Sequence, residues 1–331
     1  MPLFGRKPGK KSIRLFFATD LHGSERTFRK FINAGKFYEA NVLVMGGDIT
    51  GKLLIPIIKE SNGRYRATLQ GRIEHLETEA ELQRITDKIG LLGFYSKIMN
   101  EDEFKALQAD PAAVDALFQD LARQRLVAWV DLAETRLAVT GIKCYVTGGN
   151  DDAPEVLKVL QREKTQHFMA CEDQVVQVDD EHTMVSLAHS NPTPWKTPRE
   201  VPDERLGQMI EQVIAGVSDF SHCIFNFHVP PVDSTLDTCP MLDWTTDPPV
   251  QITRAGQPVM HGAGSAAVRR AIEKHQPVLG LHGHIHESQG MTRIGRTVCV
   301  NPGSEYGEGI LRGCLVNVAG GQVESYQMTS G

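Results

Sequence analysis

Three histidines, His282, His284 and His286, lie within five residues of one another in the stretch LHGHIHES at residues 281–288. The chain holds 12 histidines, so a quarter of them are concentrated here. Protonated imidazoles repel one another, whereas neutral imidazoles are common metal ligands. The spacing therefore indicates a site that needs neutral imidazoles pointing in one direction, such as a metal site.

Further candidate donors close apolar runs elsewhere in the chain, at Asp20, His22, Asp48, Asn150 and His228. In an extended segment, residues two apart point to the same side. Asp20 with His22, and His284 with His286, can therefore each present two donors together. His282 has the same parity but lies earlier in its run, which favours a core or supporting position over ligation.

The candidate donors are two carboxylates, one amide oxygen and four imidazoles, without cysteine. Such a mixed oxygen and nitrogen set suits Mn²⁺, Fe, Zn²⁺ or Ni²⁺ better than a structural thiolate zinc site. Seven donors exceed one tetrahedral site, and they fit two metal ions about 3.5–4 Å apart that share a carboxylate. We therefore expect two divalent metal ions, with Mn²⁺ as the first candidate.

Short apolar runs must position these donors, and each run ends in a polar or glycine cluster. The runs occupy residues 13–20, 41–48, 137–151, 183–190, 222–231, 277–288 and 297–304. Such runs are typical of strands buried on both faces. Helical patterns lie between several of them, at 24–40, 205–217 and 265–275. The alternation predicts a layered α/β fold, in which the donors can converge at the carboxyl ends of the strands.

The stretch 71–136 is charge-rich, and its pattern is helical. Asp110 and Pro111 predict a helix start, with aspartate as the N-cap and proline in the first turn. We expect a single domain over residues 1–331 with a helical insertion at 71–136. The insertion is interpreted as helices that pack on the flank of the sheet, as a cap over the site, or as a surface for homodimer formation.

Taken in order, five motifs resemble those of the calcineurin-like metallophosphoesterase superfamily over nearly the whole chain. They are DLH (20–22), GGD (46–48), GND (149–151), His228 in FHVPP, and GHIH (283–286). Other stretches resemble a subgroup of small uncharacterised archaeal and bacterial members, namely TPWKTPRE (193–200), GSAAVRRAIE (264–273), GHIHES (283–288) and NPGSEYGEGIL (301–311).

The resemblance implies a four-layer α-β-β-α sandwich with a dinuclear metal site at the strand ends. The implied ligands of one ion are Asp20, His22, Asp48 and His286, and those of the other are Asp48, Asn150, His228 and His284. Two such cations lower the pKa of a bridging water and neutralise phosphate charge during in-line attack. The expected reaction is hydrolysis of a phosphate ester by direct attack of the metal-bridging hydroxide.

The chain departs from the family pattern at two positions. Where many members carry a histidine that assists the leaving group, this chain has Asp151, and an aspartate beside two cations is expected to be ionised. We expect Asp151 to act in catalysis by positioning His228, a metal ion or water. His189 ends a strand and is a candidate proton donor, or else an ordinary surface or core histidine. Gly51 stands where members often carry a second aspartate.

Candidate substrate contacts lie in two loops and at Asn150. Trp195 offers a stacking face and Arg199 a bidentate phosphate fork in TPWKTPRE, although this stretch can also be a rigid surface loop. Ser265 begins a helix whose N-terminus can receive an anion, and an ordinary helix cap is the alternative.

Composition limits the partners and the compartment. The net charge of −6 and the pI of about 6.1 give no basic footprint, which disfavours nucleic acid as a partner and a nuclease as the function. The six cysteines form no CxxC pair, and we expect reduced, mostly buried thiols in a cytoplasmic protein. No signal peptide or membrane span is expected.

The sequence thus predicts a metal-dependent phosphodiesterase that acts on a small phosphodiester or nucleotide. A phosphomonoesterase or pyrophosphohydrolase is the alternative within the same chemistry. A non-catalytic binding scaffold of the same fold is the alternative of another class.

Overall fold

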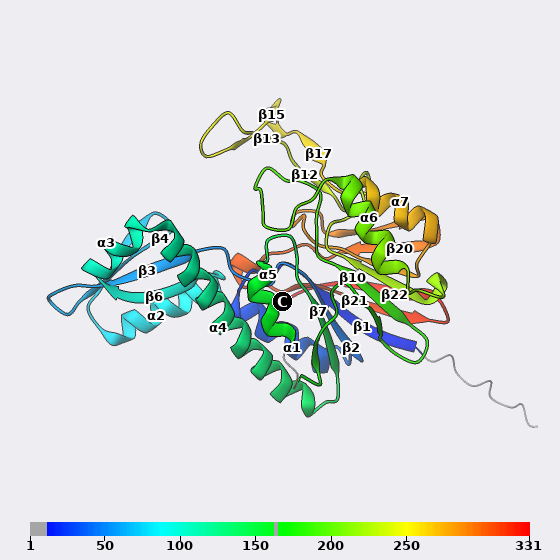
Figure 1. Cartoon of the computed structure of the whole chain (residues 1–331), viewed down its shortest axis with the longest axis horizontal. Coiled ribbons are helices and arrows are strands. Elements are labelled where there is room, and N and C mark those ends of the chain that lie inside the picture. Colours follow the sequence, from blue (N-terminus) through cyan, green and yellow to red (C-terminus); the bar gives the residue numbers. More distant parts are fainter. Residues whose placement is uncertain (1–11, 162–164) are drawn as a thin grey trace, which may run out of the picture.

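The computed structural model describes residues 12–161 and 165–331, so residues 1–11 of the basic N-terminal segment lie outside it. Two six-stranded β-sheets stack face to face (Figure 1). The first sheet has the strand order β22 (Gln322–Ser330), β21 (Arg312–Ala319), β1 (Ser12–Ala18), β2 (Val42–Gly46), β7 (Lys143–Thr147) and β8 (Phe168–Ala170). The second has the order β19 (Gly290–Ile294), β20 (Thr297–Asn301), β18 (Leu279–Leu281), β11 (Cys223–Phe227), β10 (Thr183–Leu187) and β9 (Val175–Gln177).

Each of the seven apolar runs contains a strand, as predicted. Strands β1, β2 and β7 run parallel in the first sheet, and β10, β11, β18 and β20 run parallel in the second. The polar residues that follow these strands therefore gather at one edge of each sheet. The run predicted at 137–151 starts too early, because a helix continues to Ala138 before β7 begins at Lys143.

An apolar core joins the two sheets. Phe17 and Val44 of the first sheet belong to one buried cluster with Met184, Ile224 and Leu279 of the second. Residues buried on both faces of a strand explain why the sequence shows unbroken apolar runs rather than alternation.

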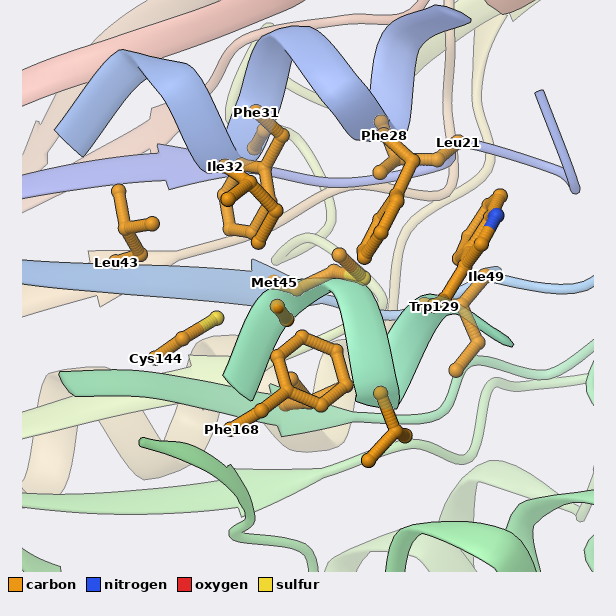
Figure 2. Packing of buried hydrophobic residues seen from close by; sticks show 14 of the residues in the cluster. Leu21, Phe28, Phe31, Ile32, Leu43, Met45, Ile49, Trp129, Cys144 and Phe168 are labelled. Carbon is orange, nitrogen blue, oxygen red and sulfur yellow. The ribbon is translucent and has the colours of Figure 1, made fainter. Parts of the chain in front are cut away.

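Helices cover the outer faces of both sheets, which completes the predicted α-β-β-α order of layers. The first sheet is covered by α1 (Glu25–Phe37), α4 (Pro111–Ala138), α5 (Pro154–Leu157) and the 3₁₀ turn η1 (Lys158–Gln161). The second sheet is covered by α6 (Asp203–Ile214) and α7 (Ala266–His275). Figure 2 shows Phe28 of α1 beside Trp129 of α4, and their rings stack at 4.0 Å. Short 3₁₀ turns occur at η2 (Phe220–His222) and η3 (Tyr306–Glu308).

The inserted segment differs from the predicted all-helical insertion. It begins at β3 (Leu54–Lys59) and forms a four-stranded sheet with β4 (Tyr65–Leu69), β5 (Arg72–Leu76) and β6 (Tyr95–Asn100). Its helices are α2 (Glu79–Leu91), α3 (Glu101–Ala109) and the start of α4, where Asp110 caps the helix as predicted. The strand β5 was mistaken for helix because its sequence, RIEHL, is mostly exposed and charged. Whether the segment is a cap or a dimer surface stays a prediction.

A second projection, which the sequence did not predict, spans residues 238–262 and is called the arm (Figure 1). It contains β12 (Thr238–Pro240), β13 (Leu242–Asp243), β14 (Val250–Gln251), β15 (Thr253–Arg254), β16 (Gln257–Pro258) and β17 (Met260–Gly262). These strands pair antiparallel, so the chain runs out along the arm and returns beside itself.

Among the described residues, no helix has both the length and the apolar character needed to cross a bilayer. The six cysteines are free thiols, and all except the half-buried Cys239 are buried, as expected.

Candidate metal centre

The predicted metal ligands come together where the parallel strands of both sheets end. Three groups of donor atoms lie close enough to hold an ion: Asp20, His22 and His286; Asp20, Asp48 and His228; and His22, Asp48 and Asp151. Asn150 and His284 adjoin these groups, and the Asn150 Oδ1 lies 2.7 Å from the His284 Nδ1. The structure thus collects donors from both sheets at one point, as the sequence predicts.

Each carboxylate is held by one oxygen and faces the cluster with the other. The Asp20 Oδ2 accepts hydrogen bonds from the Thr19 hydroxyl at 2.7 Å and from the His284 backbone amide at 3.1 Å. The Asp20 Oδ1 is buried and points into the cluster, where the His286 Nε2 lies 3.3 Å from it. The Asp48 Oδ1 accepts from the Asp151 amide at 2.9 Å, while its Oδ2 lies 3.5 Å from the His228 Nε2. The two free oxygens are therefore available to a cation.

The imidazole of His228 is oriented for ligation. Its Nδ1 lies 2.9 Å from the Gly46 carbonyl, which can only accept, so this nitrogen carries the proton. The buried Nε2 has no hydrogen-bond partner and lies 3.9 Å from the Asp20 Oδ1. A ring nitrogen that faces two carboxylates favours positive charge at this point, either a proton on the Nε2 or a bound cation. The donor set therefore fits a metal ion.

His22 and His286 face each other across the same cluster. Their Nε2 atoms are 3.1 Å apart, and the His286 Nε2 lies 3.3 Å from the Asp20 Oδ1. Burial and the charge of Lys52 hold the pKa of His22 well below its usual value, so this ring is neutral. Burial likewise lowers the pKa of His284 to about 4. Neutral rings are the form that binds metals, and His284 meets this expectation. His286 differs, because Asp20 outweighs burial and raises the pKa of this ring.

The remaining charges favour a cation at this point. Although burial opposes ionisation, His228 and His286 hold the pKa of Asp20 well below its usual value. Burial alone would lower the pKa of His228, but the carboxylates of Asp48 and Asp20 outweigh it and raise this pKa to about 9. The two carboxylates thus stabilise positive charge on the His228 ring, at the position where a cation could bind in place of the proton.

Four of the predicted ligands have a left-handed backbone, with φ of 55° at Asp20, 41° at His22, 47° at Asp48 and 67° at His284. Residues other than glycine seldom adopt this conformation, and it persists where the surrounding fold imposes it, often at functional sites. These turns, and not the alternation of an extended strand, direct the paired donors of the Asp-x-His and His-x-His motifs to one side.

The glycines of the motifs allow close approach of the loops. A Cβ at Gly149 would lie 2.1 Å from the Asp48 Oδ1, and one at Gly283 would lie 2.4 Å from the Asp20 Oδ2. A Cβ at Gly51 would lie 2.0 Å from the Gly93 carbonyl oxygen. The space at Gly51 is therefore filled by the backbone of the inserted segment, which leaves no room for the second aspartate common in the superfamily that the sequence resembles.

Asp152 supports the two ligand loops, a function that the sequence reasoning missed. Its buried carboxylate accepts hydrogen bonds from the amides of Ile49, Thr50 and Gly149 at 2.8–3.0 Å. It therefore fastens the Asp48 loop to the Asn150 loop. Its signal in the sequence was the second aspartate of GGNDD.

Lys52 is a second residue missed from the sequence. Its ammonium lies 3.2 Å from the Asp151 Oδ2, and the same oxygen lies 3.9 Å from the His22 Nδ1. Burial lowers the pKa of Lys52, but the negative charges of Asp151 and Asp48 outweigh it and raise this pKa. Burial and Asp48 raise the pKa of Asp151, while Lys52 acts against them. A fixed ammonium thus lies at the edge of the cluster.

The other predicted site residues separate into those near the cluster and those away from it. His282 is buried, and its Nδ1 bonds the Phe227 carbonyl at 2.8 Å, as expected of a supporting histidine. His189 interacts electrostatically with Asp173 and Arg205, and it is not among the described residues that line the cavity below. Its predicted role as proton donor receives no support.

Arg199 and Ser265, which were predicted to contact an anion of the substrate, instead contact other groups of the protein. The buried Arg199 guanidinium pairs with Glu172 and bonds the Gly149 carbonyl, so it supports the Asn150 loop instead of facing the cavity. The Ser265 hydroxyl accepts from the Val268 amide as an ordinary N-cap, as the alternative interpretation held. The carboxylate of Asp203 already occupies the N-terminus of α7, where it accepts from the Ala267 amide at 2.9 Å.

A cavity of about 940 Å³ opens over the cluster. Asp48, Asn150, Asp151, His284 and His286 line one part of it, together with Lys52. The loop that carries Trp195 and the arm line the rest. The cluster is thus reachable by a ligand.

No family model matches the chain. The chain is 28% identical over 156 residues to the uncharacterized protein MJ1162 of Methanocaldococcus jannaschii, a match covering 46% of this chain and 61% of that protein. The chain thus spans about three fifths of the length of the curated relative that it matches.

Solved structures show the same fold. TT1561 of Thermus thermophilus matches with a TM-score of 0.52 at 12% identity, covering 97% of this chain and 99% of that one. Another solved structure reaches 0.55 at 14% identity, covering 96% and 99%. An archaeal phosphodiesterase matches at 10% identity over 96% and 100% of the chains, but its TM-score of 0.36 is too low to support an inference. The chain therefore has an α/β sandwich fold that occurs in other proteins, with a buried Asp/His cluster suited to metal ions.

Proposed function

We propose that this protein is a phosphoesterase that depends on two divalent metal ions and prefers small phosphodiesters. The observation that carries the proposal is the buried group of Asp20, Asp48 and His228, in which the His228 Nε2 lies 3.9 Å from the Asp20 Oδ1 and 3.5 Å from the Asp48 Oδ2. Two carboxylates and an imidazole at this spacing form a donor set that a divalent ion can bind. The donors are oxygen and nitrogen, which suits Mn²⁺ first and Fe, Zn²⁺ or Ni²⁺ after it.

The same residues would hold the ions. Asp20, His22, Asp48 and His286 form one set, and Asp48, Asn150, His228 and His284 form the other. Bound divalent ions supply Lewis acidity for phosphate and lower the pKa of water. Asp48 lies between the two sets, because its free oxygen is 3.7 Å from the His22 Nε2 and 3.5 Å from the His228 Nε2.

Lys52 would bind an oxygen of the substrate phosphate. Its side chain is 40% exposed, lines the cavity and is held at 3.2 Å by Asp151. An ammonium in this place favours the extra negative charge of a phosphoryl transition state. Asp151 would act by orienting this lysine instead of by donating a proton.

Hydrolysis of bis-p-nitrophenyl phosphate and p-nitrophenyl phosphate by metal-stripped protein tests the proposal, with Mn²⁺, Ni²⁺, Zn²⁺ or Mg²⁺ added back. We expect metal-dependent cleavage of the diester that is lost in Asp48→Asn and His228→Ala. The exposed Asp87 and His75 of the inserted segment provide matched controls, Asp87→Asn and His75→Ala, which should keep full activity.

Metal content measured beside the activity separates the alternatives. Faster cleavage of the monoester would support a phosphomonoesterase. Two bound ions without turnover of either ester, or of a pyrophosphate, would support the binding scaffold. Turnover that is unchanged in both Asp48→Asn and His228→Ala would refute the proposal.

A further inference from the structure

The cavity over the predicted ligands has two parts with different chemistry. The predicted ligands and Lys52 line the polar part, here called the floor. The loop at residues 191–198 and the arm line the other part, here called the wall. Trp195 belongs to the loop at residues 191–198, and Trp244 belongs to the arm just after β13. Their rings meet edge to face with centroids 5.0 Å apart. Both nevertheless remain exposed, Trp195 by 64% and Trp244 by 43%. Exposed tryptophans that line a cavity offer flat apolar faces to a ligand.

The loop that carries Trp195 is fixed to the metal cluster. The Glu200 carboxylate accepts hydrogen bonds from the backbone amides and the hydroxyls of Thr193 and Thr197. The Thr197 hydroxyl oxygen in turn accepts a hydrogen bond from the Asn150 Nδ2 at 2.7 Å. A side chain on this loop therefore keeps a constant distance from the predicted ligand Asn150, which is the arrangement required of a recognition wall.

The cavity is larger than a phosphate group requires. Its volume of about 940 Å³ lies near the upper end of the range for sites that bind small organic molecules, roughly 300–1,000 Å³. The phosphate would occupy the part beside His286 and Lys52, which leaves the part beside the two tryptophans for the ester group. Pro194, Met241 and Leu242 also line the cavity and add apolar surface.

We infer that the substrates are phosphate esters whose ester group carries a planar aromatic ring, and that Trp195 and Trp244 hold this ring. The inference rests on the proposed function for the binding of phosphate beside the predicted metal ligands. The binding of a ring depends only on the two tryptophans. Stacking of a ring on an aromatic side chain strengthens binding by about tenfold or more. A nucleobase and an aryl group share this chemistry.

Fluorescence titration of the full-length protein, without added metal, tests the wall independently of turnover. Adenosine 5′-monophosphate carries a ring, and ribose 5-phosphate carries the same phosphate without one. We expect the nucleotide to quench tryptophan fluorescence saturably and to bind about tenfold or more tightly than ribose 5-phosphate. The third tryptophan, Trp129, is 2% exposed and supplies a constant signal.

Variants assign the effect to the wall. Trp195→Ala and Trp244→Ala should each weaken nucleotide binding by about tenfold, while Trp195→Phe and Trp244→Phe should retain most of it. Phe37→Ala is the matched control, because Phe37 is 77% exposed and lines a different cavity. In the metal-loaded enzyme, both alanine variants should raise KM for bis-p-nitrophenyl phosphate and leave kcat unchanged. The same titration with p-nitrophenyl phosphate and p-nitrophenol would show whether the two tryptophans bind an aryl ring as tightly as a nucleobase.

The outcomes distinguish this inference from the proposed function. Equal binding of the nucleotide and the sugar phosphate, or an unchanged nucleotide affinity in both alanine variants, would overturn the inference even if metal-dependent hydrolysis is found. Tight nucleotide binding that depends on both tryptophans, without hydrolysis under any metal, would support the wall and count against the proposed function.

Discussion

Asp48 presents a single oxygen to the cluster, because the backbone amide of Asp151 holds the other at 2.9 Å. Asp20 is held in the same way by Thr19 and by the His284 amide. Hydrogen bonds to the second oxygen or nitrogen of a ligand fix its direction and raise its affinity for a metal. The groups that hold these second oxygens therefore support the predicted metal centre.

Gly149→Ala should weaken metal binding and lower the melting temperature, although the substitution adds only a methyl group. The new Cβ would lie 2.1 Å from the Asp48 Oδ1 and 2.4 Å from the Asp48 backbone nitrogen, so the ligand loop must shift. Shifts of this kind typically cost about 1–3 kcal/mol. Calorimetric titration with Mn²⁺ and the melting temperature would measure both effects.

Gly307→Ala is the control for this substitution, because a Cβ at Gly307 would meet no atom within 4 Å. It should bind metal and melt like the parent protein. If Gly149→Ala bound metal with the affinity of the parent, the packing of the two loops would not determine the geometry of the centre.

Lys52→Ala should lower kcat/KM for the diester by about 10- to 100-fold, the usual range for a lost hydrogen bond to a charged group. The metal content should stay the same, because Lys52 is not a ligand. Lys52→Arg keeps the positive charge and should recover part of the activity.

The exposed Lys97 of β6 gives the control variant Lys97→Ala, which should leave the steady-state rates unchanged. A Lys52→Ala enzyme as active as the parent would exclude the proposed contact with phosphate.

At the scale of the element, Glu200 shapes the loop at residues 193–200. Burial raises the pKa of this carboxyl, but hydrogen bonds from Thr193 and Thr197 outweigh it and hold the pKa below the usual value for glutamate. A depressed pKa means that the ionised form stabilises the folded loop at neutral pH. This stabilisation is lost as the pH falls below the usual range of glutamate and through the lower pKa of the folded state.

Glu200→Gln should therefore destabilise the protein at pH 7 by about 1–2 kcal/mol, and the difference from the parent should shrink in acid. Thermal melts of both proteins between pH 7 and pH 3 would measure this. An effect of the same size at every pH would show that the charge of Glu200 has no part in it.

The sequence predicted the buried strands well, but it did not predict the exposed strands. Runs such as those that form β2 and β11 are buried along their whole length, so hydrophobicity alone identifies them. β5 and the strands of the arm are short and largely exposed, and β5 and β15 carry charged residues that strands seldom favour. Glycine-containing turns were local signals of the hairpins, for example Asn62-Gly63 between β3 and β4 and Gln70-Gly71 between β4 and β5.

The sequence predicted those residues of the candidate site that follow buried strands, and it missed those that lie on irregular loops. Its donors follow buried strands, so their order along the chain revealed them. Lys52, Asp152 and Trp244 depend on loops that meet only in the folded molecule, and no periodic pattern marks such contacts. Arg199 and Ser265 show the converse error, because suitable chemistry in the sequence was already satisfied by Glu172 and Asp203 in the fold.

At the scale of the whole molecule, the centre joins the two sheets. The Asp20 Oδ1 comes from the first sheet, and it lies 3.9 Å from the His228 Nε2 and 3.3 Å from the His286 Nε2, both from the second. A ligand that binds only the folded state stabilises it by RT ln(1 + [L]/Kd). Metal ions at this interface should therefore stabilise the whole sandwich.

Removal of metal with a chelator should lower the stability by about 2.7 kcal/mol relative to protein in metal at 100 times its Kd. Differential scanning calorimetry with and without Mn²⁺ would detect the shift. His228→Ala removes a ligand from one of the two sets, so its melting temperature should rise less with Mn²⁺ than that of the parent. A parent protein that is insensitive to metal would show that the cluster does not bind Mn²⁺ in solution.

The contacts of the centre also have a consequence for the order of synthesis. The His22 and His286 rings that face each other are 264 positions apart, and the Ser304 hydroxyl that bonds the Asp20 carbonyl is 284 positions away from it. A growing polypeptide on the ribosome therefore has Asp20 and His22 long before their partners exist. The two predicted ligand sets can therefore be complete only after His286 has been translated, whereas the group of His22, Asp48 and Asp151 is complete much earlier.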